Sequence, residues 1–519
     1  MKIIVSSFFL LIFYTKAAMA TNYYISPMGN NSYSGKSIGS PWKTFSYVIP
    51  KLKAGDTLFL LDGVYEKSNS GYPTIDCGST STARNAVNGT SSARITMRAL
   101  NERKARINGD GIKGHLVVRN CSYWNFEGLT INSRDVATLS AADGIPAFFV
   151  SNKYLTIRRF LIYNNNRYSN STCMAIQKSH NSLIEENEFY HCHRNVLTIG
   201  GNEGFSTIPS SYNIIRRNYI HGRSAADISS CTGYPKAGDW KPGTARCSSP
   251  GTTSDGGFTC YPCANNIFEN NIAEGVGTGF DVQAMNLANG NKFLGNISLG
   301  NNFGFLMQAR GATLSSMPQN NLITNMAIIN STGIGMSLRA NKNTRINNVS
   351  ISGTKSNAGF VGDNGASTAP GDGKPSLFLE NVLSTGNFSN GFRIVEQYAW
   401  TNQYSNAYKN GAVNYSPLDS HTKYSTQIDP KVGTCKVWLP ATSSMKKKGR
   451  NGADIGANIL FKYQNGSLTT QRLWNPSTGA FPCGAVVSGI NNVVGKSCND
   501  VHKRLNVNFN GCAFPTGYK

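Results

Sequence analysis

Short stretches in which apolar and polar residues alternate recur through the middle of the chain, and each contains an asparagine. They read NSLIEENEF (181–189), NIIRRNYI (213–220), NIFENNIA (266–273), NKFLGNIS (291–298), NLITNMAI (321–328), TRINNVSI (344–351) and SLFLENVL (376–383). A second element interleaves with the first and reads GFDVQ (279–283), GFLMQ (304–308), GMSLR (335–339), GFVGD (359–363) and GFRIV (391–395). Alternation with a period of two predicts short β-strands, and the repeated order of the elements predicts a repeat fold.

The spacing of the repeats narrows the fold class. The internal asparagines of the first element are Asn187, Asn218, Asn271, Asn296, Asn325, Asn348 and Asn381, with spacings of 31, 53, 25, 29, 23 and 33 residues. Units of this length are typical of a parallel β-helix, whereas a propeller repeat is longer and a sandwich would not repeat the elements in one order. We therefore expect an all-β solenoid whose asparagines stack from coil to coil. A buried apolar column should contain Phe280, Phe305, Met336, Phe360 and Phe392.

The remaining segments predict the domain boundaries. Residues 1–20 read as a secretory signal peptide ending in Ala18-Met19-Ala20, and residues 21–415 form the solenoid. A loop at about 223–255 leaves one coil, with Cys231 and Cys247 as its expected staple. Residues 416–519 are expected to be a cap over the open end, held by disulfides among four cysteines: Cys435, Cys483, Cys498 and Cys512.

The cysteine count and the net charge indicate where the protein is located and what kind of partner it binds. Twelve cysteines fit an oxidising compartment, so we expect a secreted protein. The chain has 50 Lys+Arg against 27 Asp+Glu, and loss of Lys2 and Lys16 with the signal peptide leaves 48 against 27, or +21. A basic surface of an exported protein favours an acidic polysaccharide as partner, rather than nucleic acid. A source organism whose proteins are basic in general would produce the same excess of Lys and Arg over Asp and Glu.

Two terminal segments carry a family resemblance. NYYISPMGNNSYSGKSIGSPWKTFSYVIPKLKAGDTLFLLDGVY (22–65) resembles the entry segment of secreted right-handed β-helix polysaccharide lyases, family 9 most of all, and ADIGA (453–457) is similar to their closing segment. The resemblance implies a right-handed parallel β-helix that cleaves a uronate polymer by β-elimination. It also implies calcium as a cofactor, bound by aspartates that Asp255 and Asp281 match. Gly277 and Thr278 replace two other family aspartates, and Leu306 or Met307 stands at the catalytic lysine.

The polar residues of the repeats supply candidates for the chemistry. β-Elimination needs a base and a positive group that neutralises the uronate carboxylate. Arg310 and Arg339 are the candidate catalytic residues, although an arginine is a poor base because its pKa exceeds ~12. The candidates for substrate binding are Gln283, Gln308, Lys178 and His180, of which Lys178 and His180 are alternative bases. If the residues after each inward Phe or Met face solvent, Asp281, Gln283, Gln308 and Arg339 form a polar strip.

Other interpretations stay open at this point. Asp255 and Asp281 could cap turns, in which case the chain is a non-catalytic polysaccharide-binding or structural surface protein. His191-Cys192-His193 and Cys260-x-x-Cys263 together suggest zinc, but disulfides are favoured in an exported protein. A glycoside hydrolase needs two carboxyl groups on one face, and the only neighbouring pair is Asp255 and Asp281. We expect these two aspartates on adjacent coils, close enough to share a cation.

Overall fold

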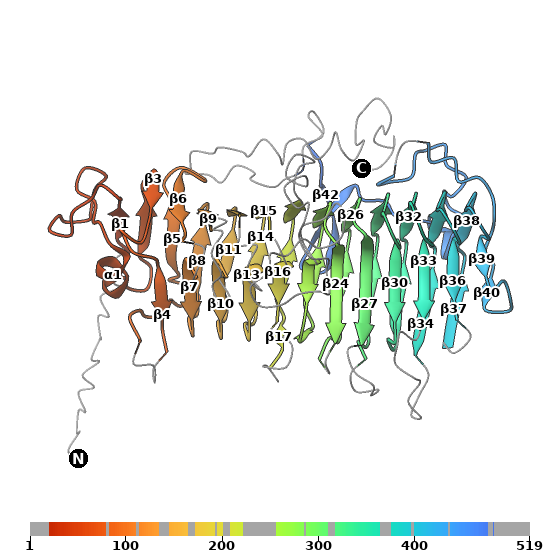
Figure 1. Ribbon diagram of the computed structural model, residues 1–519, viewed down its shortest axis with the longest axis horizontal. Coiled ribbons are helices and arrows are strands. Elements are labelled where there is room, and N and C mark those ends of the chain that lie inside the picture. Colours follow the sequence, from red (N-terminus) through yellow and green to blue (C-terminus); the bar gives the residue numbers. More distant parts are fainter. Residues whose placement is uncertain are drawn as a thin grey trace, which may run out of the picture.

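Three parallel sheets run the length of the molecule and form a right-handed parallel β-helix (Figure 1). The repeats predicted the parallel β-helix, and the family resemblance implied its right hand. The computed structural model describes residues 20–78, 83–110, 114–133, 145–164, 172–192, 195–200, 208–221, 256–284, 287–309, 317–363, 375–395, 399–433, 436–475 and 481. Each full coil contributes one strand to sheet A, one to sheet B and one to sheet C, in that order. Helix is confined, in these residues, to α1 (Phe45–Val48) and two short 3-10 turns, η1 (Ile49–Lys51) and η4 (Arg450–Gly452).

The strands are short and lie in register along each sheet. Sheet A contains β1 (Asn22–Ile25), β2 (Thr57–Leu60), β5 (Ile95–Ala99), β8 (Trp124–Glu127), β11 (Thr156–Arg158), β14 (Leu183–Glu185), β18 (Ile214–Arg216), β22 (Ile267–Glu269), β25 (Lys292–Leu294), β28 (Leu322–Thr324), β31 (Thr344–Asn347), β34 (Ser376–Glu380), β37 (Ala399–Gln403) and β40 (Thr422–Lys423). Sheet B contains β3 (Gly63–Tyr65), β6 (Ala105–Asn108), β9 (Thr130–Asn132), β12 (Leu161–Tyr163), β15 (Glu188–Tyr190), β19 (Tyr219–His221), β23 (Ile272–Glu274), β26 (Ile297–Leu299), β29 (Ala327–Ile329), β32 (Ser350–Ser352), β35 (Leu383–Thr385) and β38 (Asn406–Tyr408). Sheet C contains β4 (Thr74–Asp76), β7 (Leu116–Arg119), β10 (Ala147–Val150), β13 (Thr172–Gln177), β16 (Asn195–Ile199), β20 (Gly256–Cys260), β24 (Thr278–Ala284), β27 (Phe303–Ala309), β30 (Met336–Arg339), β33 (Phe360–Asp363), β36 (Phe392–Ile394) and β39 (Tyr415–Ser416). A short parallel pair joins β17 (Ser210–Ser211) to β21 (Cys263–Ala264), and β41 (Phe461–Gln464) pairs antiparallel with β42 (Ser467–Arg472).

The predicted apolar column is confirmed. Its members pair in register on consecutive strands of sheet C, and each side chain is at most 1% exposed: Phe280, Phe305, Met336, Phe360 and Phe392. Such inward ladders hold the coils together because every side chain packs on its equivalents above and below. The residue on either side of each column member therefore points away from the core.

Asparagines stack inside the turn between sheets A and B, as predicted, but over fewer coils. Asn187, Asn218, Asn271 and Asn296 are fully buried, and each of the first three donates its side-chain amide to the carbonyl oxygen of the next, at 2.9–3.1 Å. A second ladder precedes sheet A and runs through four buried asparagines: Asn213, Asn266, Asn291 and Asn321.

Three of the seven marker asparagines were assigned to the wrong position of the repeat. Asn325, Asn348 and Asn381 come one residue earlier in the coil than Asn296, because Leu294 pairs with Thr324. They occupy a corner with φ between 52° and 57°, a left-handed conformation that asparagine tolerates well. The inward position of these coils is taken by an apolar residue: Met326, Val349 and Val382.

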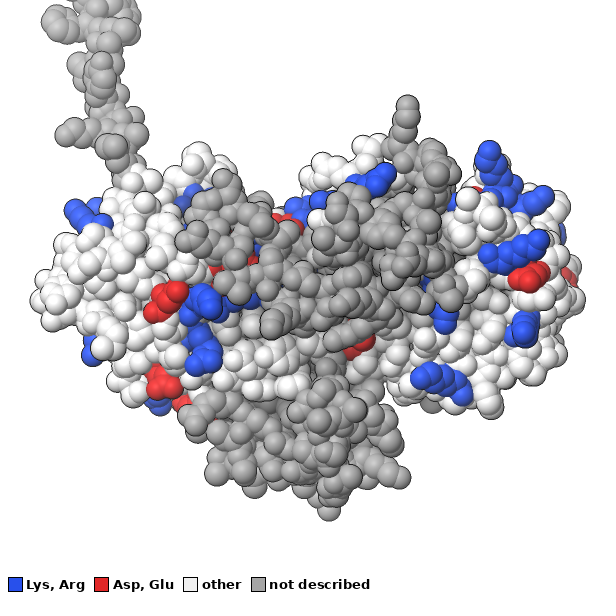
Figure 2. Space-filling model, turned by 90° about the horizontal axis from the view of Figure 1, so that it is seen from above, with Lys and Arg blue, Asp and Glu red and all other residues white. Residues whose placement is uncertain are grey.

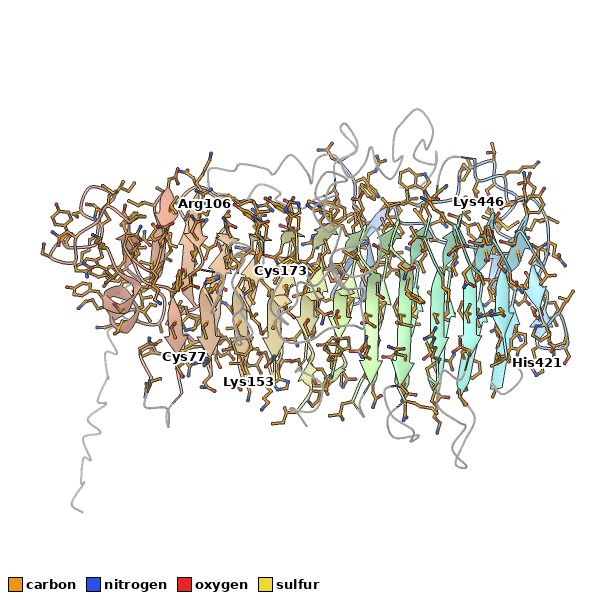
Figure 3. The ribbon with its side chains drawn as sticks, viewed as in Figure 1. Cys77, Arg106, Lys153, Cys173, His421 and Lys446 are labelled. Atoms are coloured by element: carbon orange, nitrogen blue, oxygen red, sulfur yellow. A yellow bond between two sulfur atoms is a disulfide. The ribbon has the colours of Figure 1, made fainter. Side chains whose placement is uncertain are left out.

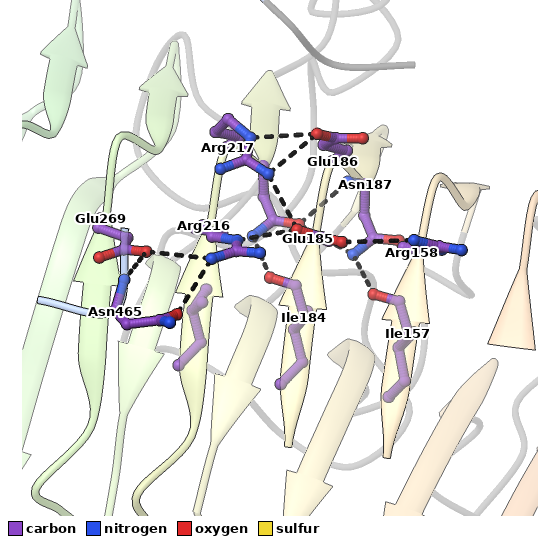
Figure 4. A network of polar contacts seen from close by, with 12 residues as sticks. Ile157, Arg158, Ile184, Glu185, Glu186, Asn187, Arg216, Arg217, Glu269 and Asn465 are labelled. Atoms are coloured by element: carbon purple, nitrogen blue, oxygen red, sulfur yellow. Dashed lines mark hydrogen bonds and ion pairs between the residues drawn. The ribbon is translucent and has the colours of Figure 1, made fainter. Parts of the chain in front are cut away.

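A row of charges follows the same corner on its outer side (Figure 4). Arg158 contacts Glu127 on the preceding coil at 2.6 Å and Glu185 on the next at 3.8 Å. Arg216 then lies 2.8 Å from Glu185 and 3.7 Å from Glu269. The sign of the charge therefore alternates from one coil to the next.

After the last coil the chain runs back along the side of the solenoid. We call residues 436–475 the strap; it ends near the middle coils, where β42 is labelled in Figure 1. Its apolar residues, among them Val437, Trp438, Ile459, Leu460 and Trp474, are buried against Tyr219, Ile272, Ile297, Ala327 and Ile329 of sheet B. We expected residues 416–519 to form a cap over the open end. The strap packs along this flank, and residues 482–519 lie outside the described ranges, so the cap stays a prediction.

The strap is bound by the corner asparagines, one coil after another. Arg450 donates its backbone N–H to Asn381 at 2.9 Å, Asn348 donates its amide to the carbonyl of Asp454 at 2.7 Å, and the backbone N–H of Asn458 lies 2.6 Å from Asn325. The backbone N–H of Tyr463 donates to Asn270 at 2.5 Å. The strap therefore satisfies side chains that leave the solenoid at its corner.

Three disulfides lie within the described residues and connect Cys77 to Cys121, Cys173 to Cys192 and Cys260 to Cys263 (Figure 3). Cys192, Cys260 and Cys263 are thus bonded to other cysteines, which confirms disulfide pairing over zinc at these positions. Cys231, Cys247 and the four C-terminal cysteines lie outside the described residues, as does the predicted signal peptide up to residue 19. Among the described helices, none has the length and apolar character needed to cross a membrane.

Candidate functional site

The outer face of sheet C carries a row of polar side chains along the solenoid axis. Gln283, Gln308, Arg339 and Asp363 are direct partners on β24, β27, β30 and β33. The residues before the first three, Val282, Met307 and Leu338, are fully buried in the core. Because side chains alternate along a strand, these side chains lie on the outer side of sheet C. Gln283 is nevertheless only 7% exposed, so the solvent-facing strip expected from the sequence is not open at this residue.

Asp281 lies beside this row on β24. Its side chain is 4% exposed, and its Oδ2 accepts a hydrogen bond from Gln283 Nε2 at 2.5 Å. Its partners in register are Thr259 on β20 and Leu306 on β27, both also buried. Asp281 is therefore the carboxylate of a buried polar cluster at the edge of the row.

A glycine makes space within this cluster. A Cβ atom on Gly256 would lie 2.3 Å from Thr259 Oγ1, 3.2 Å from Asn195 Oδ1 and 3.6 Å from Asp281 Oδ2. These three side chains are at most 4% exposed. Three oxygens from three strands thus converge on the space that only glycine leaves open.

Arg339 is the cation of the row and is about one third exposed. Its Nε lies 3.6 Å from Asp363 Oδ1, and its guanidinium lies over the ring of Phe303 at 5.9 Å from the ring centre. The ring and the carboxylate hold the guanidinium in place on the outer surface. The exposed N–H groups of Arg339 remain accessible to an anionic group, for which the planar guanidinium is well suited.

The structure distinguishes the two residues that stand at the family's lysine position. Met307 points into the core with no exposed surface, whereas Leu306 lies on the outer face directly beside Asp281. The outer neighbour of this carboxylate is therefore apolar. A lysine here would have been within reach of Asp281, but a leucine supplies neither charge nor base.

Lys178 and His180 lie away from the row, in the turn after β13. Lys178 has a left-handed backbone with φ 47°, and His180 is bridged to Lys153 and Ser211 on neighbouring coils. Burial, together with the positive charge of Lys153, lowers the pKa of His180. In sheet C, β13 is separated from β24 by β16 and β20, so the structure does not bring these two residues to the Asp281 cluster.

Two predicted site residues lie outside the described ranges, and three residues of the site were not predicted from the sequence. Asp255 and Arg310 lie outside the described residues, so their placement on this face stays a prediction. Asp363 occupies the fifth position of GFVGD, equivalent to Gln283 and Arg339, and that position could have identified it. Asn195 and Thr259 carry no comparable signal, because neither belongs to a repeat element identified in the sequence.

The spacing of the carboxylates limits the chemistry of the described row. Asp281 and Asp363 are three strands apart, or about 14 Å, since neighbouring strands lie ~4.8 Å from each other. Paired acids of glycoside hydrolases lie within ~9.5 Å. These two aspartates therefore do not form such a pair. Nor do the described residues contain any group of three or more His, Cys, Asp or Glu placed to hold a metal.

Comparison with solved structures finds matches of low sequence identity. Pectate lyase Pel9A shares 15% identity over 85% of this chain and 97% of its own, with a TM-score of 0.48. A mannuronic acid specific family 6 polysaccharide lyase from human gut microbiota shares 14% over 79% and 92%, with a TM-score of 0.43. The GH136 lacto-N-biosidase from Eubacterium ramulus shares 12% over 79% and 67%, with a TM-score of 0.39. No protein-family model and no curated sequence matches the chain. At these identities the likeness concerns the fold alone.

Proposed function

We propose that the outer face of sheet C binds an acidic polysaccharide, and that the protein is a secreted lyase that cleaves a uronate polymer by β-elimination. The observation that carries this proposal is the in-register row of Gln283, Gln308 and Arg339 along the solenoid axis. A row that presents hydrogen-bonding groups on consecutive coils complements a linear polymer that repeats its hydroxyl and carboxylate groups. Disulfides within the solenoid agree with export to an oxidising compartment.

Each side chain of the row has a role in this proposal. Arg339 pairs with a uronate carboxylate, and Gln283 and Gln308 bind sugar hydroxyls. Pairing with a cation acidifies the proton α to the carboxylate. A base removes that proton, and the electrons of the broken C–H bond form the new C=C double bond. The bond from carbon to the glycosidic oxygen breaks, and this oxygen takes a proton from water as it leaves. We assign the base to Arg310, which directly follows β27 in the chain and has to lose its own proton before it can accept one from the sugar.

The general charge of the molecule supports an anionic partner. The sequence carries a formal net charge of +23. Figure 2 shows lysines and arginines spread over both ends of the viewed face, without gathering at one spot. A distributed positive field attracts a long polyanion along the whole solenoid, whereas a compact patch would favour a small anion.

We also propose that calcium binds in the Asp281 cluster, among the oxygens of Asp281, Thr259 and Asn195 around Gly256. Calcium takes six to eight oxygen ligands. The cluster supplies Asp281 Oδ2, Thr259 Oγ1 and Asn195 Oδ1, which are oxygen donors of the right kind but too few alone. Asp255 directly precedes Gly256 in the sequence, and its carboxylate is our candidate for a further ligand. Bound calcium would supply positive charge near a uronate carboxylate.

A second candidate function is polysaccharide binding without cleavage. The observation that favours it is the pair Asp281 and Leu306, because the outer neighbour of the carboxylate is apolar. In addition, the four described members of the row include no lysine or histidine that could act as a conventional base. Such a protein would hold the same polymer with Arg339 and the two glutamines, and would release it unchanged.

One set of assays separates the two functions. The mature protein is incubated with pectate, alginate and glycosaminoglycans, with and without calcium, and the absorbance of the unsaturated product is followed. Polymer binding is measured in parallel by gel retardation. Arg339→Gln is expected to weaken cleavage and binding about tenfold, or ~1.4 kcal/mol. Arg345→Gln is the matched control, because Arg345 is an exposed arginine on β31 of sheet A, outside the proposed binding face.

The outcomes are distinct. Product formation that Arg339→Gln reduces supports the lyase, whereas retardation without product supports the binding protein. The absence of both with all three polymers would reject the proposed site altogether. Calcium is expected to raise the melting temperature of the wild type by mass action and to leave Asp281→Asn unchanged. Equal melting temperatures with and without millimolar calcium in the wild type would reject the calcium proposal.

A further inference from the structure

A cavity lies under the strap, away from the outer face of sheet C. It has a volume of about 230 Å³ and is bounded on one side by β32 and β35 of sheet B. The other side is formed by residues on both sides of the start of the strap, including Val432, Lys436 and Leu439. The cavity is therefore made of two separate parts of the chain, within 350–386 and 432–439. Neither part encloses it alone.

One charged group faces this cavity. Lys436 is half-buried, and its Nζ donates a hydrogen bond to Asn330 Oδ1 at 3.0 Å. No ion pair joins Lys436 to a carboxylate within the described ranges of the chain. Burial lowers the pKa of Lys436, and no neighbouring charge offsets this effect. An ammonium group with one neutral partner retains two N–H donors, and an anion beside it would favour its charged form.

The rest of the wall combines apolar surface with hydroxyls. Leu383, Trp438 and Leu439 line the cavity and are at most 2% exposed. Ser352 and Thr385 are partners in register on β32 and β35, and both residues line the same wall of the cavity. Thr385 donates its own hydrogen to the carbonyl of Tyr408, which leaves its oxygen to accept a hydrogen bond from a ligand.

The wall is poorly suited to phosphate. Phosphate sites usually use several cations or a set of free backbone N–H groups. This cavity has a single cation, and the backbone N–H groups of Gly353 and Gly386 already donate to the next coil, at 3.2 and 3.1 Å. A purely apolar ligand would leave the ammonium group without an anion. The wall thus fits a ligand with one carboxylate, several hydroxyls and an apolar ring face.

From this arrangement we infer that the cavity under the strap binds a single sugar acid, with its carboxylate on Lys436 and its hydroxyls on Ser352 and Thr385. The volume agrees, because pockets for drug-sized ligands span ~300–1,000 Å³ and this one is slightly smaller. The ligand contacts both the strap and sheet B, so it stabilises the docked strap by mass action. The site is separate from the outer face of sheet C and does not depend on the function proposed for that face.

The test is calorimetric titration of the mature protein with galacturonate, and with galactose as the neutral sugar of the same size. Galacturonate is expected to bind and galactose to bind at least tenfold more weakly. Lys436→Met is expected to weaken galacturonate binding at least tenfold. Lys448→Met is the matched control, since Lys448 is an exposed lysine of the same strap. The control should bind as the wild type does.

Two further variants make the result unambiguous. Ser352→Phe fills the cavity without removing the charge, and it is also expected to weaken binding at least tenfold while the protein stays folded by circular dichroism. Arg339→Gln removes the uronate contact proposed on the outer face of sheet C, and the galacturonate site that Lys436→Met abolishes should persist in this variant. Equal affinity of Lys436→Met and wild type, equal affinity for galactose and galacturonate, or no heat with galacturonate would each overturn the inference. Loss of binding in Arg339→Gln with retention in Lys436→Met would place the sugar acid on sheet C and overturn it equally.

Discussion

Truncation of one ladder asparagine is predicted to cost the solenoid more than most point mutations. Asn271 has no exposed surface. Its amide donates to the carbonyl of Ile215 at 2.8 Å and to Asn296 Oδ1 at 3.1 Å. Its Oδ1 accepts from both the backbone N–H and the side-chain amide of Asn218, each at 3.0 Å. Asn271→Ala removes all four bonds and leaves their partners buried.

The magnitude follows from these contacts. A typical intramolecular hydrogen bond contributes ~1 kcal/mol net, and a buried polar group left without its partner costs ~1–3 kcal/mol. Four bonds in a site closed to water therefore predict a loss of about 4 kcal/mol in the free energy of unfolding. The loss should be concentrated in the coils of Asn218 and Asn296, because a solenoid is stabilised mainly by contacts between neighbouring coils.

The assay is urea denaturation of the wild type and Asn271→Ala, with amide hydrogen exchange to locate the effect. Asn88→Ala is the matched control, because Asn88 accepts a single exposed hydrogen bond from the backbone N–H of Ser122. The control should lose less than about 1 kcal/mol. If Asn271→Ala lost no more than the control, the asparagine ladder would not contribute the stability assigned to it here.

Three further predictions address burial, the strap and the charge row. Burial lowers the pKa of His115 to about 4, below the ~6.5 of an unfolded chain. The stability that neutral His115 contributes is therefore complete above pH 6.5 and decreases by ~3 kcal/mol as the pH falls towards 4. In urea denaturation, His115→Gln should lose correspondingly less stability than the wild type between pH 7 and 4, and an equal loss would contradict this. Trp474→Ala should cost the strap ~3–5 kcal/mol, because Trp474 is 1% exposed, and hydrogen exchange should accelerate in the strap but not in the N-terminal coils. Arg216→Met removes the cation that Glu185 and Glu269 share, but Arg217 still contacts Glu185 at 2.9 Å, so the expected cost is ~1–3 kcal/mol. A stability equal to wild type in urea would contradict the role of the row.

The sequence was sufficient to predict the repeating coil, but it did not fix the position of every residue within the coil. Phe280 and Phe305 could be aligned because the inward position repeats with the same residue type and the same flanking glycine. Asparagine has two uses at the corner, since Asn270 tolerates the left-handed backbone and Asn271 stacks inside. Both uses place an asparagine in the sequence, at adjacent positions of the coil, so the sequence alone does not distinguish them. The register of Asn325 was therefore misassigned, and only the pairing of whole strands corrects it.

The candidate site was predictable only in part, for a related reason. Gln283 and Arg339 share one position of a repeat, so their alignment on the outer face followed from the period. Thr259 belongs to no identified repeat, and its convergence with Asp281 depends on how far the coils are offset. The strap was not predictable, because contacts such as Asn270 with Tyr463 join residues 193 positions apart without any periodic pattern.

The alternating charge row gives the chain a means of identifying its correct neighbours during folding. An asparagine ladder is nearly the same in every coil, so it would form almost as well if one coil were skipped and a strand paired with the next one along. The charges at the corner do not allow this exchange. Skipping the coil of Glu185 would place Arg158 beside Arg216, and skipping that of Arg216 would bring two buried carboxylates together. Like charges at such a distance are strongly unfavourable away from water. The alternating charges thus favour the correct stacking order of the coils, in the part of the solenoid where the asparagine ladder alone would also form with one coil skipped.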